Sequence, residues 1–240
     1  MIVRGNSKHS FLVDTLKIGV LGGIGPEATG EFYNKLISTL QEKGLIKSNK
    51  DFPQIIVNSI PAPELIYDTI SEEELQPYID GLKELDSYDV DFIVMVCNTI
   101  HLYHERLQKE VKVPILDLRK ELRDKLQREY VKSVLVIGTP STIRQGLYRF
   151  DDLKCFEPSS EEMSVLTESI FEFNKGIDKE NQTKKARDIC EKYLSKGAGT
   201  VVLGCTEFAV MLGDEDMPTI NTIDVLVESA VLRFMSNKNF

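Results

Sequence analysis

Phe92-Ile-Val-Met-Val-Cys-Asn-Thr-Ile-His101 is the stretch of sequence that decides the fold. An unbroken apolar run leads into a cysteine and two polar residues, after which a helical pattern begins. Such a run is typical of a strand that is buried on both faces of a parallel sheet. Ligands bind beyond the carboxyl ends of strands of this kind, where Cys97, Asn98 and Thr99 stand.

A second stretch has the same design, in which an apolar strand ends in a cysteine and a threonine before a helix: Thr200-Val-Val-Leu-Gly-Cys-Thr-Glu207. One cysteine at the end of a strand is common, because cysteine is often a small buried apolar residue. Two strand ends of the same design, far apart in the chain, predict the two halves of one site.

Strands and helices alternate along the chain from residue 17 onward. Helical periodicity separates the expected strands, which are residues 17–21, 54–58, 92–96, 113–116, 133–137, 153–156, 200–204 and 218–220. This alternation predicts an α/β fold with parallel sheets. Twice along the chain, a strand that ends in glycine or threonine is followed later by a strand that ends in cysteine. We therefore expect two similar domains, each a parallel β-sheet flanked by helices, with the active site in the cleft between them.

The chain is expected to cross between the two domains near residues 116 and 219. The first domain then comprises residues 17–116 plus 220–240, and the second comprises residues 117–219. Residues 1–16 contain no long apolar stretch of the kind that a signal peptide needs, so they are interpreted as an N-terminal extension.

Composition excludes several classes of protein. The formal net charge is −9 and no basic stripe is present, which argues against a nucleic-acid partner. No apolar run approaches the roughly 20 residues that cross a bilayer, so we expect no membrane partner. Four widely spaced cysteines do not form a disulfide framework, and they indicate a reduced, cytoplasmic protein.

The glycine-rich turn after the first strand contains Gly23-x-Gly25-x-x-Ala28, which fits a dinucleotide-binding fingerprint. The acidic residue that should end the second strand is missing, because that position is Asn58 followed by Ser59, and Asp51 precedes the strand. A small carboxylate held by the helix N-terminus at Gly25 fits the turn at least as well.

Two further chemistries are considered at the first cysteine. Cys97, His101 and His104 have metal-ligand side chains, but no second cluster supplies the fourth ligand of a typical zinc site, so no metal is expected. A cysteine hydrolase is disfavoured, because a base one turn along the same helix points away from the substrate. His101 is expected to support the cysteine turn by a hydrogen bond.

Two cysteines that flank a substrate can take a proton from one face of a carbon and return one to the other. Each cysteine precedes a helix, whose partial positive charge is expected to favour the thiolate. Cys190, on an apolar helix face, and Cys155, in a mixed edge strand, are expected to be structural instead.

Three blocks of the sequence resemble the signature motifs of the aspartate/glutamate racemase family: Leu21-Gly-Gly-Ile-Gly-Pro-Glu-Ala-Thr29, Cys97-Asn-Thr-Ile-His101 and Leu203-Gly-Cys-Thr-Glu207. The resemblance implies stereoinversion at the Cα of an amino acid without pyridoxal phosphate or another cofactor. It implies that Cys97 and Cys205 are the two acid–base residues, and that the protein is a homodimer.

The resemblance also implies which residues bind the amino acid substrate: Gly25, Asn98, Thr99, Thr139, Ser141, Thr142, Lys175, Thr206 and Glu207. Glu207 stands where aspartate-type members have glutamate and glutamate-type members commonly have histidine, which favours aspartate as substrate.

One position departs from the family pattern. Some aspartate racemases carry an arginine in the loop after the second strand, where it clamps the side-chain carboxylate; this chain has Glu64 or Leu65 there. Aspartate, glutamate, a broader set and a neutral amino acid all stay open as substrates. The rival functions are a related cysteine-dependent isomerase or lyase, such as a maleate isomerase, and a non-catalytic, two-lobed amino acid binding module.

Overall fold

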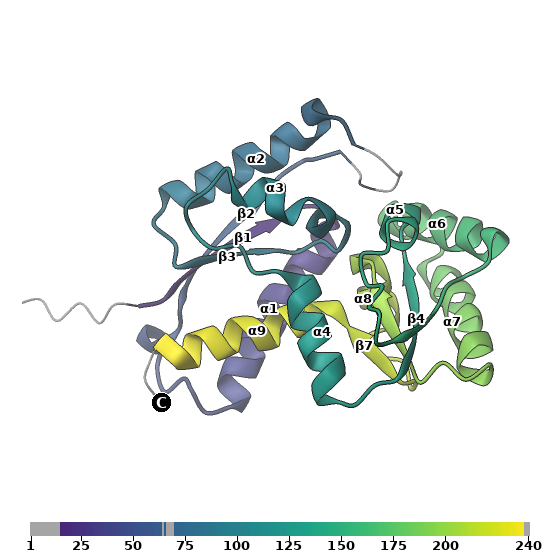
Figure 1. Cartoon of the computed structure of the whole chain (residues 1–240). Helices are drawn as coiled ribbons and strands as arrows, with labels where there is room; N and C mark the ends of the chain where they lie inside the picture. Colours follow the sequence, from purple (N-terminus) through teal and green to yellow (C-terminus); the bar gives the residue numbers. More distant parts are fainter. Residues whose placement is uncertain (1–14, 64, 66–69, 238–240) are drawn as a thin grey trace, which may run out of the picture.

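The chain folds into two parallel sheets that lie side by side, each flanked by helices (Figure 1). The computed structural model describes residues 15–63, 65 and 70–237. The predicted N-terminal extension lies outside the described residues, apart from its last two. The α/β fold predicted from the sequence is confirmed.

The first sheet has the strand order β2-β1-β3, and all of its pairs are parallel. Helices α2 and α3 cover one face of this sheet, and α1 and α9 lie on the other (Figure 1). The elements of this half are β1 (Lys17–Gly22), α1 (Pro26–Glu42), β2 (Gln54–Ser59), α2 (Glu72–Ser87), β3 (Phe92–Met95) and α3 (His104–Gln108), with short 3₁₀ helices at Asn49–Asp51 and Thr99–Tyr103.

The second sheet has the strand order β5-β4-β6-β7 and is also wholly parallel. The remaining elements are α4 (Leu118–Arg128), β4 (Ser133–Gly138), α5 (Pro140–Arg144), β5 (Lys154–Phe156), α6 (Ser160–Asn174), α7 (Lys179–Ser195), β6 (Thr200–Gly204), α8 (Thr206–Leu212), β7 (Thr219–Asn221) and α9 (Thr222–Asn237).

Two details differ from the sequence-based expectation. Residues 113–116 form no strand, because only one bridge, between Ile93 and Ile115, joins them to β3. The expected return to the first domain at residue 220 falls inside β7, which pairs with β6 of the second sheet. Helix α9, which follows, packs against α1 and α4.

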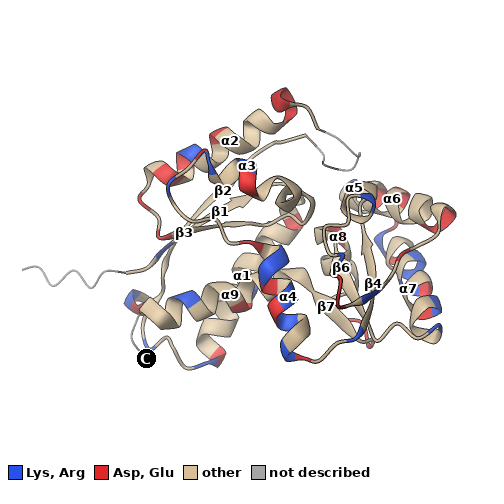
Figure 2. Ribbon diagram, in the orientation of Figure 1, with Lys and Arg blue, Asp and Glu red and all other residues tan. Residues whose placement is uncertain are grey.

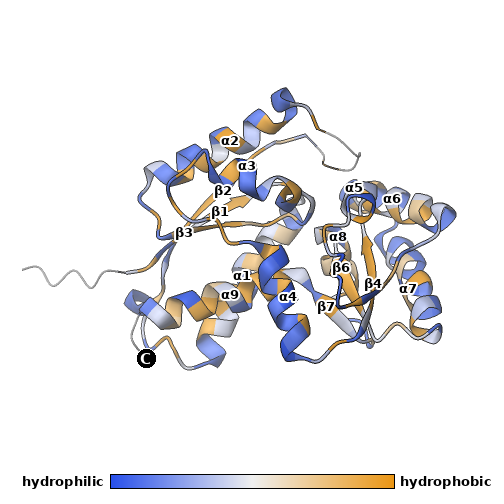
Figure 3. Cartoon of the chain, viewed as in Figure 1, coloured by the Kyte–Doolittle hydropathy of each residue, from blue (hydrophilic) through white to orange (hydrophobic). Residues whose placement is uncertain are grey.

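The two halves share one apolar core. A continuous cluster joins Ile18 and Val94 of the first sheet to Val136 and Val202 of the second, and Phe234 of α9 is part of it. Strands β4 and β6 of the second sheet are correspondingly apolar along most of their lengths (Figure 3). Burial of this kind stabilises by roughly 25 cal/mol per Å² of apolar surface, so α9 holds the two halves together chiefly by packing.

Charged side chains lie mainly on the helices and loops, whereas the strands carry few of them (Figure 2). Within the described part of the chain, no helix has both the length and the apolar character that a bilayer span requires.

Candidate active site

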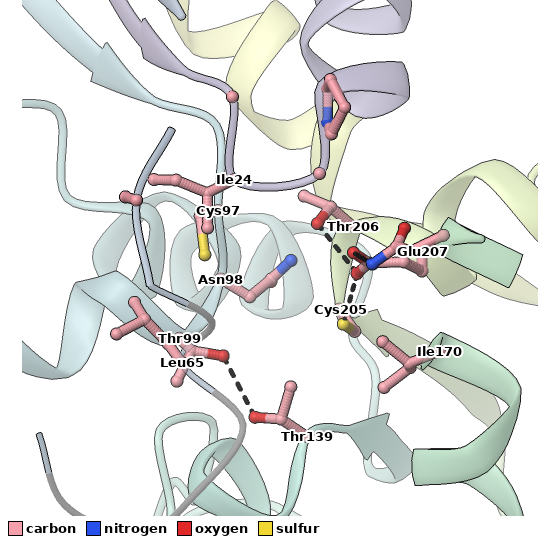
Figure 4. Close-up of a pocket in the computed structure, with 15 residues that line it drawn as sticks. Ile24, Leu65, Cys97, Asn98, Thr99, Thr139, Ile170, Cys205, Thr206 and Glu207 are labelled. Carbon is pink, nitrogen blue, oxygen red and sulfur yellow. Dashed lines mark hydrogen bonds between the residues drawn. The ribbon is translucent and has the colours of Figure 1, made fainter. Parts of the chain in front are cut away.

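Cys97 and Cys205 line the same cavity, which has a volume of about 210 Å³ and lies at the carboxyl ends of β3 and β6 (Figure 4). Parallel strands present their carboxyl ends at one edge of a sheet, and the two sheets turn these edges toward each other. The predicted site residues that line the cavity are Gly25, Cys97, Asn98, Thr99, Thr139, Cys205, Thr206 and Glu207.

Cys97 follows β3 and is almost completely buried. Burial raises the pKa of its thiol to about 12, although the backbone N–H groups of Ile100 and Thr99 act in the opposite direction. The backbone N–H groups of this turn favour the thiolate, as expected, but their effect on the pKa is smaller than that of burial. The loss of solvation outweighs the helix, and Cys97 is a thiol.

The thiol of Cys205 is hydrogen-bonded to a carboxylate. Its Sγ donates to Oε2 of Glu207 at 2.8 Å, and Thr206 Oγ1 donates to the same oxygen at 3.1 Å. Asn174 Nδ2 donates to the other oxygen, Oε1, at 2.9 Å, which fixes the carboxylate. Burial, and then the charge of Glu207, raise the pKa of Cys205 well above its ordinary value.

Gly25 brings the first half close to this second cysteine turn. It caps α1 with a left-handed backbone, φ 83°, and Pro26 follows as the first helical residue. A Cβ at Gly25 would lie 3.0 Å from Thr206 Oγ1 and 3.2 Å from Glu207 Oε1. Glycine is therefore required here both for its backbone conformation and for the close approach of the two halves.

Three threonines join the two halves beneath the cavity. Thr99 Oγ1 lies 3.1 Å from Thr139 Oγ1 and 3.0 Å from Thr142 Oγ1. Thr139 caps α5, accepting from the backbone N–H of Thr142 at 3.1 Å. Thr99 and Thr139 line the cavity, whereas Thr142 lies outside it and is hydrogen-bonded to both of them.

Asn98 is held by Thr222 and Tyr148, which the sequence analysis missed. Its Nδ2 donates to Thr222 Oγ1 at 3.1 Å, and Thr222 Oγ1 donates to the carbonyl of Leu203 at 2.8 Å. Its Oδ1 accepts from the hydroxyl of Tyr148. One amide N–H of Asn98 is thereby left over for a ligand in the cavity.

Three predicted site residues lie outside the cavity, Thr142 among them. Ser141 is buried in α5 and accepts from Gln145 Nε2 at 2.8 Å. Lys175 caps the C-terminus of α6 with 59% of its side chain exposed, and it pairs with Glu172 at 3.0 Å. The neighbouring Asn174 is the residue of this turn that enters the cavity. No sequence motif marks it.

The imidazole of His101 is hydrogen-bonded to the end of β3, just before Cys97, and to the start of α4. Leu118 N donates to its Nδ1 at 3.4 Å, so the proton is on Nε2, which donates to the carbonyl of Met95 at 3.3 Å. Burial, followed by the neighbouring His104, lowers the pKa of His101 to about 3. Among the described residues, no three His, Cys, Asp or Glu side chains come together as a metal site.

The buried imidazole predicts a loss of stability in acid. The His101 imidazole binds a proton near pH 6.5 in the unfolded chain but only near pH 3 in the folded protein. Its contribution to the free energy of unfolding is therefore complete above pH 6.5 and falls as the pH drops between these two values. At pH 4.5 the contribution to the free energy of unfolding is about 2 to 3 kcal/mol lower than at pH 7.5. Urea unfolding of His101→Gln should show a pH dependence smaller by this amount. His104→Gln, which keeps the buried imidazole, should not.

Comparison with known proteins identifies relatives over nearly the whole chain. The chain is 26% identical over 228 residues to the broad specificity amino-acid racemase RacX of Bacillus subtilis, a match that covers 91% of this chain and 98% of the relative. It is 27% identical to the crystal structure of an aspartate racemase homologue from Pyrococcus horikoshii, with a TM-score of 0.71 and coverage of 91% and 98%.

The aspartate racemase of Picrophilus torridus has the same fold, with a TM-score of 0.77 at 22% identity and coverage of 93% of this chain and 98% of that one. The family model described as Asp/Glu/Hydantoin racemase matches residues 21–230, a range that includes both cysteine turns and the glycine turn against which the second one packs. The chain therefore belongs to the Asp/Glu/hydantoin racemase family.

Proposed function

We propose that the protein racemises a free α-amino acid by moving the α-proton between two thiols, those of Cys97 and Cys205. One observation carries the proposal: two buried cysteines, one from each half, open into the same small cavity, and one of them is hydrogen-bonded to a carboxylate. Two acid–base groups that approach a carbon from different sides are what a two-base inversion requires.

The proton balance of the proposed mechanism involves Glu207. Cys205 transfers its thiol proton to Glu207 Oε2, and the resulting thiolate removes the α-proton from one face of the substrate. The Cys97 thiol delivers its proton to the other face, which leaves Cys97 as thiolate and Cys205 as thiol. Glu207 is then protonated, and this end state is the starting state for the opposite enantiomer, with the roles of the cysteines reversed. Return of the Glu207 proton to the Cys97 thiolate restores the resting site, so the site neither gains nor loses a proton.

The weak acidity of the α-carbon requires stabilisation of the carbanion. We assign the α-carboxylate to the hydrogen-bond donors of Asn98 and Thr99, which line the cavity. Hydrogen-bond donors that are already in position in a cavity that excludes water stabilise a developing negative charge more strongly than the same donors do in solution. The hydrogen bonds that hold the side chains of Asn98 and Thr99 in place support this role.

The proposal covers free α-amino acids as a class. Aspartate is the expectation that follows from Glu207, and the relatives include broad-specificity and glutamate racemases as well as aspartate racemases. A reduced, cytoplasmic location and a homodimer also belong to the proposal. All four cysteines are free in the structure, which is consistent with a reducing compartment.

Proton NMR in D₂O tests the proposed reaction. Reduced protein is incubated separately with each of the common L-amino acids, and the product is resolved by chiral chromatography. Loss of the α-proton signal with appearance of the D-enantiomer is the expected result. Binding without exchange would favour the binding module, and conversion of maleate to fumarate without amino acid exchange would favour the isomerase; either result would refute the racemase.

A further inference from the structure

Apolar side chains from both halves line parts of the cavity on more than one side, and together they are called its apolar wall. Ile24 comes from the turn before α1, Ala62 and Leu65 from the segment after β2, and Ile170 from α6. Leu65 and Ile170 are almost completely buried, whereas Ile24 is half-buried. Figure 4 shows Ile24 beside Cys97, Leu65 beside Thr99 and Ile170 beside Cys205. A ligand that spans the two thiols therefore meets this wall.

The charge of the cavity is the second observation. Within the described part of the chain, no lysine or arginine lines it, and its charged side chain is that of Glu207. The sequence from Ile60 to Glu74 also contains no lysine or arginine. Lys175, the nearest lysine in sequence to the lining residue Asn174, pairs with Glu172 on the outer surface. A second carboxylate in the cavity would lose its water without gaining a cation.

We propose that the substrate is an amino acid with an uncharged, apolar side chain, which the wall of Ile24, Leu65 and Ile170 contacts. This inference rests on the proposed racemase function. The cavity volume of about 210 Å³ is smaller than the roughly 300 to 1,000 Å³ of pockets for drug-sized ligands. That space suits a small free amino acid, and the polar side chains of Asn98 and Thr99 are left for its α-carboxylate.

The test compares kcat/KM across matched substrates: L-methionine and L-leucine, L-aspartate and L-glutamate, and L-lysine. We expect methionine or leucine to exceed aspartate by about 100-fold or more, because an apolar wall gives a carboxylate no partner. Fastest turnover of an acidic or a cationic amino acid would overturn the inference while leaving the racemase intact. Absence of turnover with every amino acid would refute the racemase instead.

Measuring amino acid binding to the Cys97→Ser variant tests the preference of the apolar wall separately from turnover. Calorimetric titration should show tighter binding of L-methionine than of L-aspartate, with the same preference whether or not the protein proves to be a racemase. Tighter binding of aspartate would overturn the inference independently of turnover.

A cation placed in the wall should reverse the preference. Leu65→Arg is expected to raise the ratio of kcat/KM for aspartate to that for methionine at least about 10-fold, because arginine pairs with carboxylates in a bidentate manner. Leu65→Met, which keeps the wall apolar, is the matched control and should keep the wild-type ratio to within a few-fold. Ile24→Lys, at a half-buried position, provides a second cation should Leu65→Arg fail to fold. An unchanged ratio in the folded cationic variants would refute contact between this wall and the substrate side chain.

Discussion

Cys97→Ser and Cys205→Ser are each expected to lower kcat/KM for racemisation by at least about 10³-fold, because each removes one of two acid–base groups. The two enantiomers have equal free energies in solution, so kcat/KM must fall by the same factor in both directions. The rate loss alone therefore cannot show that the two thiols serve different faces of the substrate.

Exchange of the α-proton with D₂O, followed from each pure enantiomer, supplies the missing information. A variant with one cysteine can still remove the proton from the face that this cysteine serves and return deuterium to the same face. We expect Cys97→Ser to exchange one enantiomer without inversion, Cys205→Ser to exchange the other, and the double variant to exchange neither. Exchange of the same enantiomer by both single variants would contradict the two-face arrangement.

The control for these measurements is Cys155→Ser. Cys155 lies in the edge strand β5, outside the cavity, and its Sγ donates to the carbonyl of Tyr148, a bond that a serine hydroxyl can replace. Wild-type racemisation is expected from this variant. Equal loss of activity in all three cysteine variants would indicate a general effect of thiol removal rather than a role in proton transfer.

The elements that position the cysteines follow from local sequence pattern. Helix α4 spans Leu118–Arg128, between two of the expected strands, because its apolar spacing is a property of the segment itself. The predicted strand at residues 113–116 fails, since a strand depends on a partner and only Ile115 has one. Sequence pattern therefore predicts which segments are helical more reliably than how many residues pair in a sheet.

Side-chain direction at the ends of helices could not be predicted from the sequence. The family resemblance indicated Lys175, yet the C-terminal turn of α6 directs Asn174 toward Glu207 and leaves Lys175 in solvent. The protonation state of Cys97 and Cys205 could not be predicted from the sequence either. A helix N-terminus is visible in the sequence, but the complete burial that raises the pKa of Cys97 depends on how the two halves meet.

Glu207→Gln is expected to lower kcat about 10²- to 10³-fold at neutral pH, since glutamine preserves the shape of the side chain but cannot accept the proton of Cys205. Thr206 and Asn174 hold the carboxylate in place, so its position is set before any substrate binds. Glu172→Gln is the matched control, because it removes a glutamate of α6 that pairs with Lys175 away from the cavity.

The pH dependence separates a proton acceptor from a merely structural residue. In the wild type the thiol proton moves to Glu207 and stays in the site, so kcat should vary little between pH 7 and 9. In Glu207→Gln the thiolate forms only by losing its proton to solvent. Burial, the leading cause, still holds the pKa of Cys205 above its ordinary value, although the loss of the Glu207 charge lowers it from its wild-type position. The rate of the variant should therefore rise about tenfold per pH unit across this range, and the deficit should shrink. A pH-independent deficit in Glu207→Gln would show that the carboxylate only positions the cysteine turn.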